Sequence, residues 1–272
     1  MSWFEAQSPL LQAFLSGVVA WAAVAAGAAG VALLRRIDQR LLDLMLGFAA
    51  GVMLAASFWS LLAPSIELAG NLSIPAWLPA ASGLALGGLF LRVMDAVLPH
   101  LHPGYPPSAA EGVRTAWHRT TLLVTAITLH HIPEGLALGI AFGAVGAGLD
   151  SAGVVPISGA VALTIGMAIQ GFPEGAAVAL PIRAAGMSRP RSFWYGQLSA
   201  AIDPIAAVVG ALAVVAVQDL LPYALAFAAG AMIYVIVEEI IPGSQRHGNE
   251  HLATVAVIGG FAVMMILAVA LG

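Results

Sequence analysis

The chain has 272 residues, of which 60% are hydrophobic and only 9% are charged, with a formal net charge of -4 and a mean hydropathy of +0.95. This composition excludes a soluble globular domain of average makeup, and the lack of any basic run argues against a nucleic-acid partner. Cysteine is absent, which removes disulfides and thiolate metal ligands.

Apolar runs long enough to cross a lipid bilayer recur along the whole chain. A helix needs about 20 predominantly apolar residues to span the hydrocarbon core, and eight runs meet this length. The expected spans are 10–34, 41–62, 76–98, 120–145, 154–180, 193–217, 221–241 and 252–271. They leave no room for a soluble domain, so the sequence predicts an all-α polytopic membrane protein built as a single integral membrane domain.

The distribution of arginine predicts the orientation of these spans. Lysine is absent, and the ten arginines fall at or near one side of the predicted membrane. The loops expected on the other side, 70–74, 146–156 and 218–222, contain no basic residue. By the positive-inside rule both termini should lie outside, in the periplasm of a bacterial plasma (inner) membrane.

The fourth and fifth spans each contain a Pro-Glu-Gly segment. His130 and Glu134 are four residues apart and share one helix face, as do Gln170 and Glu174. A charge at the middle of a bilayer costs at least ~2.5 kcal/mol, and a divalent cation would let two neighbouring carboxylates both ionise. Imidazole nitrogen and carboxylate oxygen suit zinc and related first-row ions. The two segments therefore predict an intramembrane metal site.

Three further residues are candidate ligands. His131 points about 100° away from His130, so it is either a ligand of a second site or a satisfied polar residue. Asp203 lies in the sixth span, where a carboxylate has no packing role, and could complete a second metal position. The local sequence alone makes Met53 more typical of a core residue that fills a gap in the packing than of a thioether ligand. A buried hydrogen-bond network or a His–Glu proton relay remains the alternative for the whole cluster.

The paired segments HHIPEG and IQGFPEG resemble the ZIP (Zrt/Irt-like) divalent metal transporters, closest to their GufA-type branch. LGFAAGVMLAAS in the second span, FWYGQLSAAIDP entering the sixth and LAFAAGAMIYVIVEEIIP in the seventh are similar to the corresponding family helices, so the resemblance covers nearly the whole chain. It implies a secondary transporter, using no ATP and no organic cofactor, that imports zinc and related ions such as cadmium, iron and manganese by alternating access. It also implies that helices one to three and six to eight form inverted repeats around helices four and five.

The resemblance assigns roles to individual positions. It implies a primary site at His130, Glu134, Gln170 and Glu174, with Met53 as its thioether. The second half of a binuclear site would use Glu134, Glu174 and Asp203. The family often has asparagine at the position of His131 and aspartate or asparagine at that of Gly171, so the second site is either weaker or rebuilt around His131.

The resemblance also implies two sets of functional residues away from this central site. An exit or regulatory metal site on the cytoplasmic side is implied at Asp95, His100, His102, Glu238 and Glu239. An entrance path on the outer side is implied at Ser60 and Glu67.

Two other classes of function are weighed against transport. An intramembrane zinc hydrolase would bury similar residues, but HExxH is missing and no glutamate is left as a separate general base, so we expect no enzyme. A cation or proton channel would conduct without saturating at low metal concentration. The expected partners are divalent metal ions and the lipid bilayer, and small-residue helix faces leave open a homodimer or simple intramolecular packing.

Overall fold

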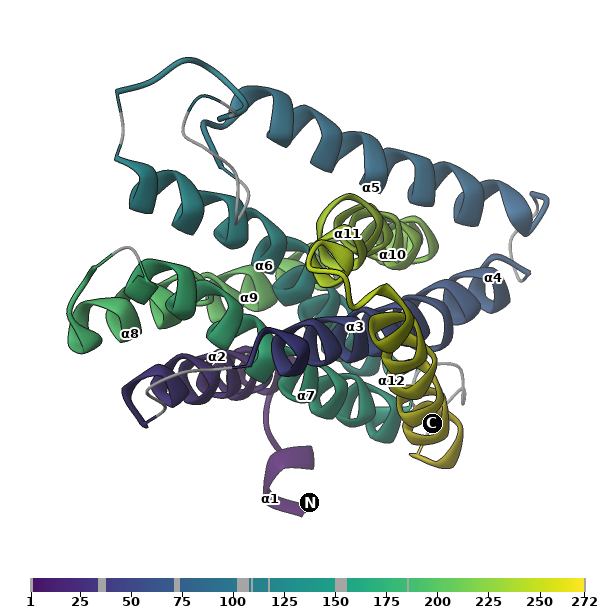
Figure 1. Cartoon of the computed structure of the whole chain (residues 1–272). Helices are drawn as coiled ribbons and strands as arrows, with labels where there is room; N and C mark the ends of the chain where they lie inside the picture. The colour runs from purple at the N-terminus through teal and green to yellow at the C-terminus, as the bar shows by residue number, and fades with distance from the viewer. Residues whose placement is uncertain are drawn as a thin grey trace.

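The computed structural model describes residues 2–33, 38–70, 74–101, 108, 110–116, 118–149, 156–184 and 186–271 (Figure 1). Regular structure in these ranges is helical, apart from one isolated β-bridge between His100 and Glu111. The helices are α1 (Ser2–Glu5), α2 (Pro9–Leu33), α3 (Gln39–Ala56), the π-helix η1 (Ser57–Leu62), α4 (Ala63–Ala69), α5 (Trp77–Val97), α6 (Arg119–Ala144), the π-helix η3 (Val145–Leu149), α7 (Ile157–Ala184), α8 (Arg189–Leu198), α9 (Asp203–Ala216), the 3-10 helix η4 (Gln218–Leu220), α10 (Leu221–Val235), the π-helix η5 (Ile236–Ile240), α11 (Ile241–Gln245) and α12 (Glu250–Leu271).

Eight helical segments within the described ranges are long and apolar enough to cross a membrane, which confirms the predicted all-α, eight-span architecture. Their bounds are Pro9–Gly30, Gln39–Ala69, Trp77–Val97, Thr121–Gly148, Ile157–Arg183, Arg189–Ala216, Leu221–Gln245 and Glu250–Leu271. Most agree with the expected spans to within a few residues. The second is longer, because η1 and α4 continue α3 without interruption.

The sixth span differs from the continuous helix expected from its hydropathy, because a turn at 199–202 divides it into α8 and α9. Pro204 is the second residue of α9, and proline has no backbone N–H for the carbonyl four residues earlier. Around the turn, the backbone N–H of Ala201 and of Asp203 each donate to the carbonyl three residues back. The break places Asp203 in the first turn of α9, inside the span.

The helices pack mainly in four pairs: α2 with α7, α6 with α9, α3 with α12, and α5 with α10 (Figure 1). Contacts of α2 with α9 join the first two pairs into what we call the first helix group, which also contains α8. The second helix group contains α3, α5, α10 and α12, with η1, α4, η5 and α11. The four pairings stay the same when span one is exchanged with six, two with seven, three with eight, and four with five. An inverted repeat would produce this symmetry.

Within each group the paired helices touch at their backbones. A Cβ atom added to any of four glycines would lie no more than 2.0 Å from a carbonyl oxygen of the partner helix: Gly27, Gly87, Gly139 and Gly260. Between the groups, Gly166 of α7 instead faces the side chain of Met264 on α12. Small residues at helix interfaces allow this close approach in membranes. Each group is therefore tightly packed, with side chains forming much of the contact between the groups.

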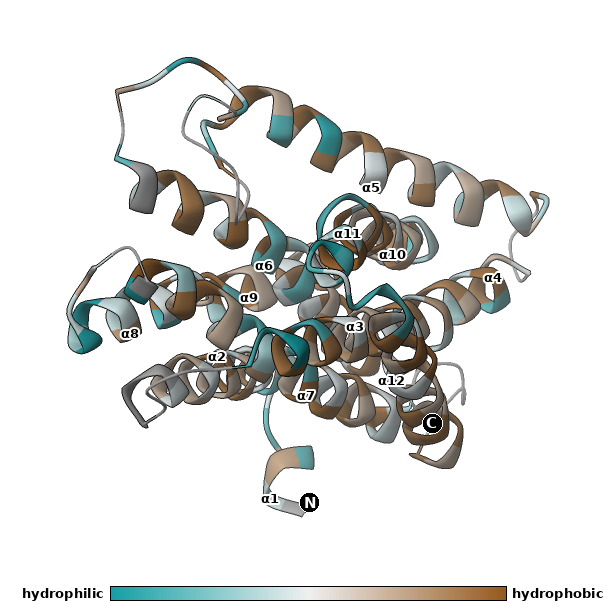
Figure 2. Ribbon diagram, in the orientation of Figure 1, coloured by the Kyte–Doolittle hydropathy of each residue, from teal (hydrophilic) through white to brown (hydrophobic). Residues whose placement is uncertain are grey.

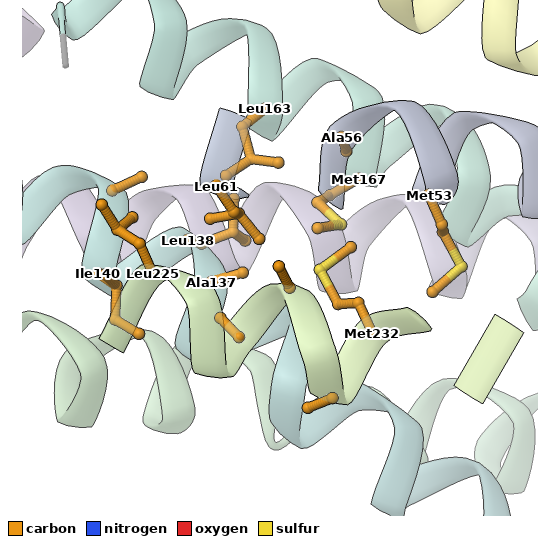
Figure 3. Close-up of a cluster of buried hydrophobic side chains, with 14 of the residues drawn as sticks. Met53, Ala56, Leu61, Ala137, Leu138, Ile140, Leu163, Met167, Leu225 and Met232 are labelled. Carbon is orange, nitrogen blue, oxygen red and sulfur yellow. The ribbon is translucent and has the colours of Figure 1, made fainter. Parts of the chain in front are cut away.

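The apolar surfaces follow from the same architecture. Large aliphatic side chains lie exposed along α5, α9 and α12, for example Leu89, Val209 and Val269. Hydrophobic residues predominate along the spans (Figure 2). Such faces suit contact with lipid tails. A buried cluster containing Met53, Leu138, Leu163 and Met232 lies where α3, α6, α7 and α10 meet, so it joins the two groups (Figure 3).

Candidate metal centre

Three buried side chains form a polar cluster inside the first helix group. His131 and Glu134 of α6 and Asp203 of α9 each offer one ligand atom, and these atoms lie within 4.8 Å of one another. Nδ1 of His131 lies 3.4 Å from Oε2 of Glu134 and 3.3 Å from Oδ1 of Asp203. Ligand atoms around a single zinc ion at ~2.0 to 2.2 Å lie roughly 3 to 4 Å apart, so small side-chain movements would suffice to coordinate one ion.

Local sequence explains why these three residues meet. His131 and Glu134 are three residues apart and so lie on one face of α6. A Cβ added to Gly135 would lie 2.7 Å from the carbonyl oxygen of Asp203, so the absence of a side chain at this position lets α9 approach α6. Gly17 of α2 lies equally close to the backbone of α9, since a Cβ added there would lie 2.6 Å from Cα of Pro204. Glycines on two helices therefore fix the position of Asp203.

Several buried polar atoms of this region have no hydrogen-bond partner within the described part of the chain. They are both ring nitrogens of His131, both carboxylate oxygens of Asp203, and one oxygen each of Glu134, Gln170 and Glu174. The ion pairs that His131 forms with Glu134 and with Asp203 therefore lack hydrogen-bond geometry. An unsatisfied buried polar atom costs about 1 to 3 kcal/mol, which natural structures rarely tolerate in such numbers without a ligand or water. A donor set of imidazole nitrogen and carboxylate oxygen fits a divalent cation.

The Pro-Glu-Gly segment of α7 faces the same centre. Gln170 and Glu174 are buried, and Glu174 lies within electrostatic range of Glu134, His131 and Asp203. The amide nitrogen of Gln170 lies 3.7 Å from Sδ of Met167, which leaves its carbonyl oxygen for another partner.

Gly171 contributes no side-chain ligand, because glycine has no side chain. A Cβ at this position would lie 2.9 Å from Cγ2 of Val24 on α2, so the site is closed there by helix packing.

His130 lies on a different side of α6 and has a different partner. Its Nε2 atom is 2.8 Å from Oε2 of Glu239, which belongs to η5 in the second helix group. The structure thus brings His131, rather than His130, to Asp203. The roles of His130 and Glu239 as metal ligands stay predictions.

Met53 of α3 is 1% exposed and belongs to the buried cluster of aliphatic and methionine side chains (Figure 3). Its thioether lies in the same cluster as those of Met167 and Met232. Its role as a ligand also stays a prediction.

The residues expected on the cytoplasmic side are partly brought together. The hydroxyl of Tyr234 donates to Oδ2 of Asp95 at 2.9 Å, and Nε2 of His100 lies 3.6 Å from Oδ1 of the same carboxylate. Glu238 is exposed, whereas Glu239 is buried. His102 lies outside the described residues.

Of the residues expected along the entrance path, Ser60 is half-buried on η1 and Glu67 is exposed on α4.

Two residues of interest were missed by the sequence analysis. Tyr234 precedes Glu238 by one helical turn, a spacing that could have linked it to the same face. Asp43 is fully buried at the start of α3 and accepts hydrogen bonds from Gln39 at 2.8 Å and Asn249 at 2.8 Å, with His247 at 3.1 Å. Two of these partners are remote in sequence, so no local pattern could have found this second cluster.

The family model and the relatives that match this chain are all described as zinc transporters. The family model described as ZIP Zinc transporter matches residues 106–268. The Zinc transporter ZIP11 of Bos taurus is 42% identical, covering 97% of this chain and 98% of the relative. The Zinc transporter ZIPB of Bordetella bronchiseptica is 40% identical, covering 96% and 81%. The Zinc transporter GufA of Myxococcus xanthus is 35% identical, covering 95% and 98%.

Proposed function

Because the chain belongs to the ZIP zinc transporter family, with GufA among its relatives, we propose that this integral membrane protein imports zinc and related divalent ions into the cytoplasm. The single observation that carries the proposal is the buried cluster of His131, Glu134 and Asp203, five of whose side-chain polar atoms have no hydrogen-bond partner in the described chain. Intramembrane ionisable residues are functional by default, and these offer a ligand set for a divalent ion.

The proposed site uses both Pro-Glu-Gly segments. His131, Glu134 and Asp203 hold the ion, and Glu174 and Gln170 add oxygen ligands from α7. His130 and Met53 complete a neighbouring position, which makes the site binuclear with bridging glutamates. Lysine is absent and the ten arginines fall at or near one side of the predicted membrane, so the charge of the transported ion offsets that of the carboxylates.

The proposed path crosses the membrane from the outside, where the termini lie. The ion passes Ser60 and Glu67, sheds its water and binds at the centre. On release to the cytoplasm it meets Asp95, His100, Glu238 and Glu239. We place the protein in a bacterial plasma (inner) membrane, following the arginine distribution.

Alternating access would use the two helix groups. The centre is built within the first group, from α6, α7 and α9, while glycine contacts keep the helices of each group together. The contact between the groups consists largely of side chains, including flexible methionines, which can repack during movement. This difference in packing supports movement of one group relative to the other. Midplane sites on interrupted helices are common in transporters built from repeats.

The donor set also bears on selectivity and on enzymatic activity. Nitrogen and oxygen ligands without thiolates suit zinc, and they accept cadmium, iron and manganese with different affinities. Glu134 faces the ligands His131 and Asp203, so it has no separate position as a general base. The relatives are named as transporters, which fits the proposal that the protein is not an enzyme.

The test is zinc and cadmium uptake into proteoliposomes that contain the purified protein and an entrapped metal-sensitive dye. The unaltered chain is compared with Glu134→Ala, His131→Ala and His130→Ala. Glu250→Gln, a change of an exposed carboxylate at the start of α12, serves as the control. Saturable uptake that is lost with Glu134→Ala but kept with Glu250→Gln would support the proposal. Flux that persists without Glu134, or binding without any flux, would contradict it.

A further inference from the structure

A groove on the surface of the first helix group lies between α2 and α7. Its volume is about 500 Å³, within the range of about 300 to 1,000 Å³ that is usual for sites of small molecules. Its two rims are exposed, Val19 to 49% and Ile165 to 38%. The side chains that form its walls are Ser16, Val18 and Val19 of α2 and Val161, Thr164 and Ile165 of α7.

The packing of α2 explains why the groove exists. Further along the two helices the backbones touch, because Gly27 of α2 meets the carbonyl group of Phe172 on α7. Nearer its beginning α2 instead meets α9, where Gly17 lies against Pro204. The neighbours of Gly17 on α2 line the groove. The space between α2 and α7 therefore opens at the level where α2 packs against α9.

The lining of the groove suits hydrocarbon. Only two of its lining residues are polar, and both hydroxyl groups donate within their own helix: Ser16 to the carbonyl oxygen of Ala13 at 2.7 Å, and Thr164 to that of Ala160 at 2.9 Å. No hydroxyl hydrogen is left for a ligand. An ordered water needs two to four polar partners, whereas aliphatic walls gain dispersion contacts from an apolar chain.

The depth of the groove places it among lipid tails. Its residues on α2 and α7 come four to ten positions after the first residue of each helix, which is roughly 6 to 15 Å along the axis. The hydrocarbon core of a bilayer is about 30 Å thick, so a groove that opens sideways here faces acyl chains.

The short helix α1 closes one end of the groove. The ring of Phe4 packs edge-on against that of Phe142 with centroids 5.6 Å apart, and both rings line the groove. The side-chain amide of Gln12 donates to the carbonyl oxygen of Phe4 at 2.9 Å, which fixes α1 there. Trp3 of α1 is exposed, as is common for tryptophan at the level of lipid headgroups.

The charges near this end favour a phospholipid over a free fatty acid. Residues 1–34 and 142–182 contain no arginine, lysine or histidine, so no basic side chain of these segments could pair with the carboxylate of a fatty acid. A zwitterionic phospholipid carries its own counter-charge and needs no such partner.

We propose that the groove between α2 and α7 binds one acyl chain of a zwitterionic phospholipid, whose headgroup lies beside α1. This lipid site is separate from the metal centre, and its occupation does not depend on zinc transport. The bound chain packs against α2 at the level where Gly17 meets the carbonyl oxygen of Asp203, so it supports the helix that lies behind the metal centre.

The experiment is photolabelling of the full chain in vesicles of dioleoyl phosphatidylcholine. The vesicles contain a trace of phosphatidylcholine with a diazirine midway along one acyl chain, and mass spectrometry of peptides locates the label. We expect a several-fold higher yield at 15–19 and 161–165 than around Val209, which is exposed on α9. Equal yields would show ordinary contact with bulk lipid and overturn the proposal.

Variants that fill the groove test the site itself. Val161→Phe fills it from α7 and Val18→Phe from α2, so either variant serves if the other fails to fold. Val209→Phe adds the same ring to the open face of α9 and is the control. Labelling of the groove should fall several-fold with either filling variant and stay unchanged with the control. Labelling that persists in a folded, filled variant would overturn the proposal.

Two further measurements separate the occupants. Oleic acid carrying a diazirine, used in place of the labelled phospholipid, should label the groove more weakly, and stronger labelling would show a fatty-acid site instead. Dioleoyl phosphatidylcholine added to delipidated protein in detergent should raise the Tm of the unaltered chain more than that of Val161→Phe, because a ligand stabilises the state that binds it. An equal rise in both would contradict binding in the groove.

Discussion

Replacing Gly27 with alanine should disturb the metal centre from a distance, because this glycine sets the spacing of α2 and α7. The added Cβ would lie 1.8 Å from the carbonyl oxygen of Phe172, which precedes Pro173 and Glu174. Ordinary carbon–oxygen contacts are far longer, so α7 must move away by more than an ångström. Glu174 must move with it.

Gly30 is a matched control on the same helix. A Cβ there would meet no described atom within 4 Å, so Gly30→Ala should gain up to about 1 kcal/mol from helix propensity. At Gly27 the same gain is opposed by overpacking, which typically costs about 1 to 3 kcal/mol. The stabilities of the two variants should therefore differ by roughly 2 kcal/mol.

The effect on zinc binding follows from the displaced carboxylate. Changes that disturb the orientation of metal ligands typically cost 10- to 100-fold in affinity, so we expect a loss of about tenfold for Gly27→Ala and none for Gly30→Ala. Thermal unfolding of the detergent-solubilised protein measures stability, and dye competition measures zinc affinity. Equal stability and equal affinity in the two variants would refute the inference that glycine packing positions Glu174.

Three further predictions concern the polar clusters. His131→Asn should weaken zinc binding about tenfold in dye competition, because an amide oxygen replaces the imidazole beside Asp203; unchanged affinity would place the ion elsewhere. Uptake should fall as the outside is acidified from about pH 8 to pH 5, since protons compete for imidazole and carboxylate ligands, and a flat profile would contradict this ligand set. Asp43→Ala should lower stability by about 2 to 3 kcal/mol in thermal unfolding by removing the hydrogen bonds that this buried carboxylate accepts from Gln39 and Asn249, while zinc affinity stays the same; a protein of unchanged stability would show that this cluster contributes little.

The sequence determined the features that depend on residues close together along the chain. Hydropathy is a local property, so the length of each apolar run was enough to locate the eight spans. Helical periodicity placed His130 and Glu134 on one face of their helix, and the Pro-Glu-Gly segments marked the helices that carry the centre. The absence of cysteine already restricted the ligands to nitrogen, oxygen and thioether groups.

Tertiary structure alone decided which of the two adjacent histidines meets Asp203. That choice depends on the rotation and offset of α6 relative to α9, which are fixed by contacts of Gly135 and Gly139 with a helix remote in sequence. The pairing of His130 with Glu239 likewise requires the π-helix η5 to turn this carboxylate towards the other helix group. Periodicity gives the face of a helix, but packing between distant helices determines which residues meet there.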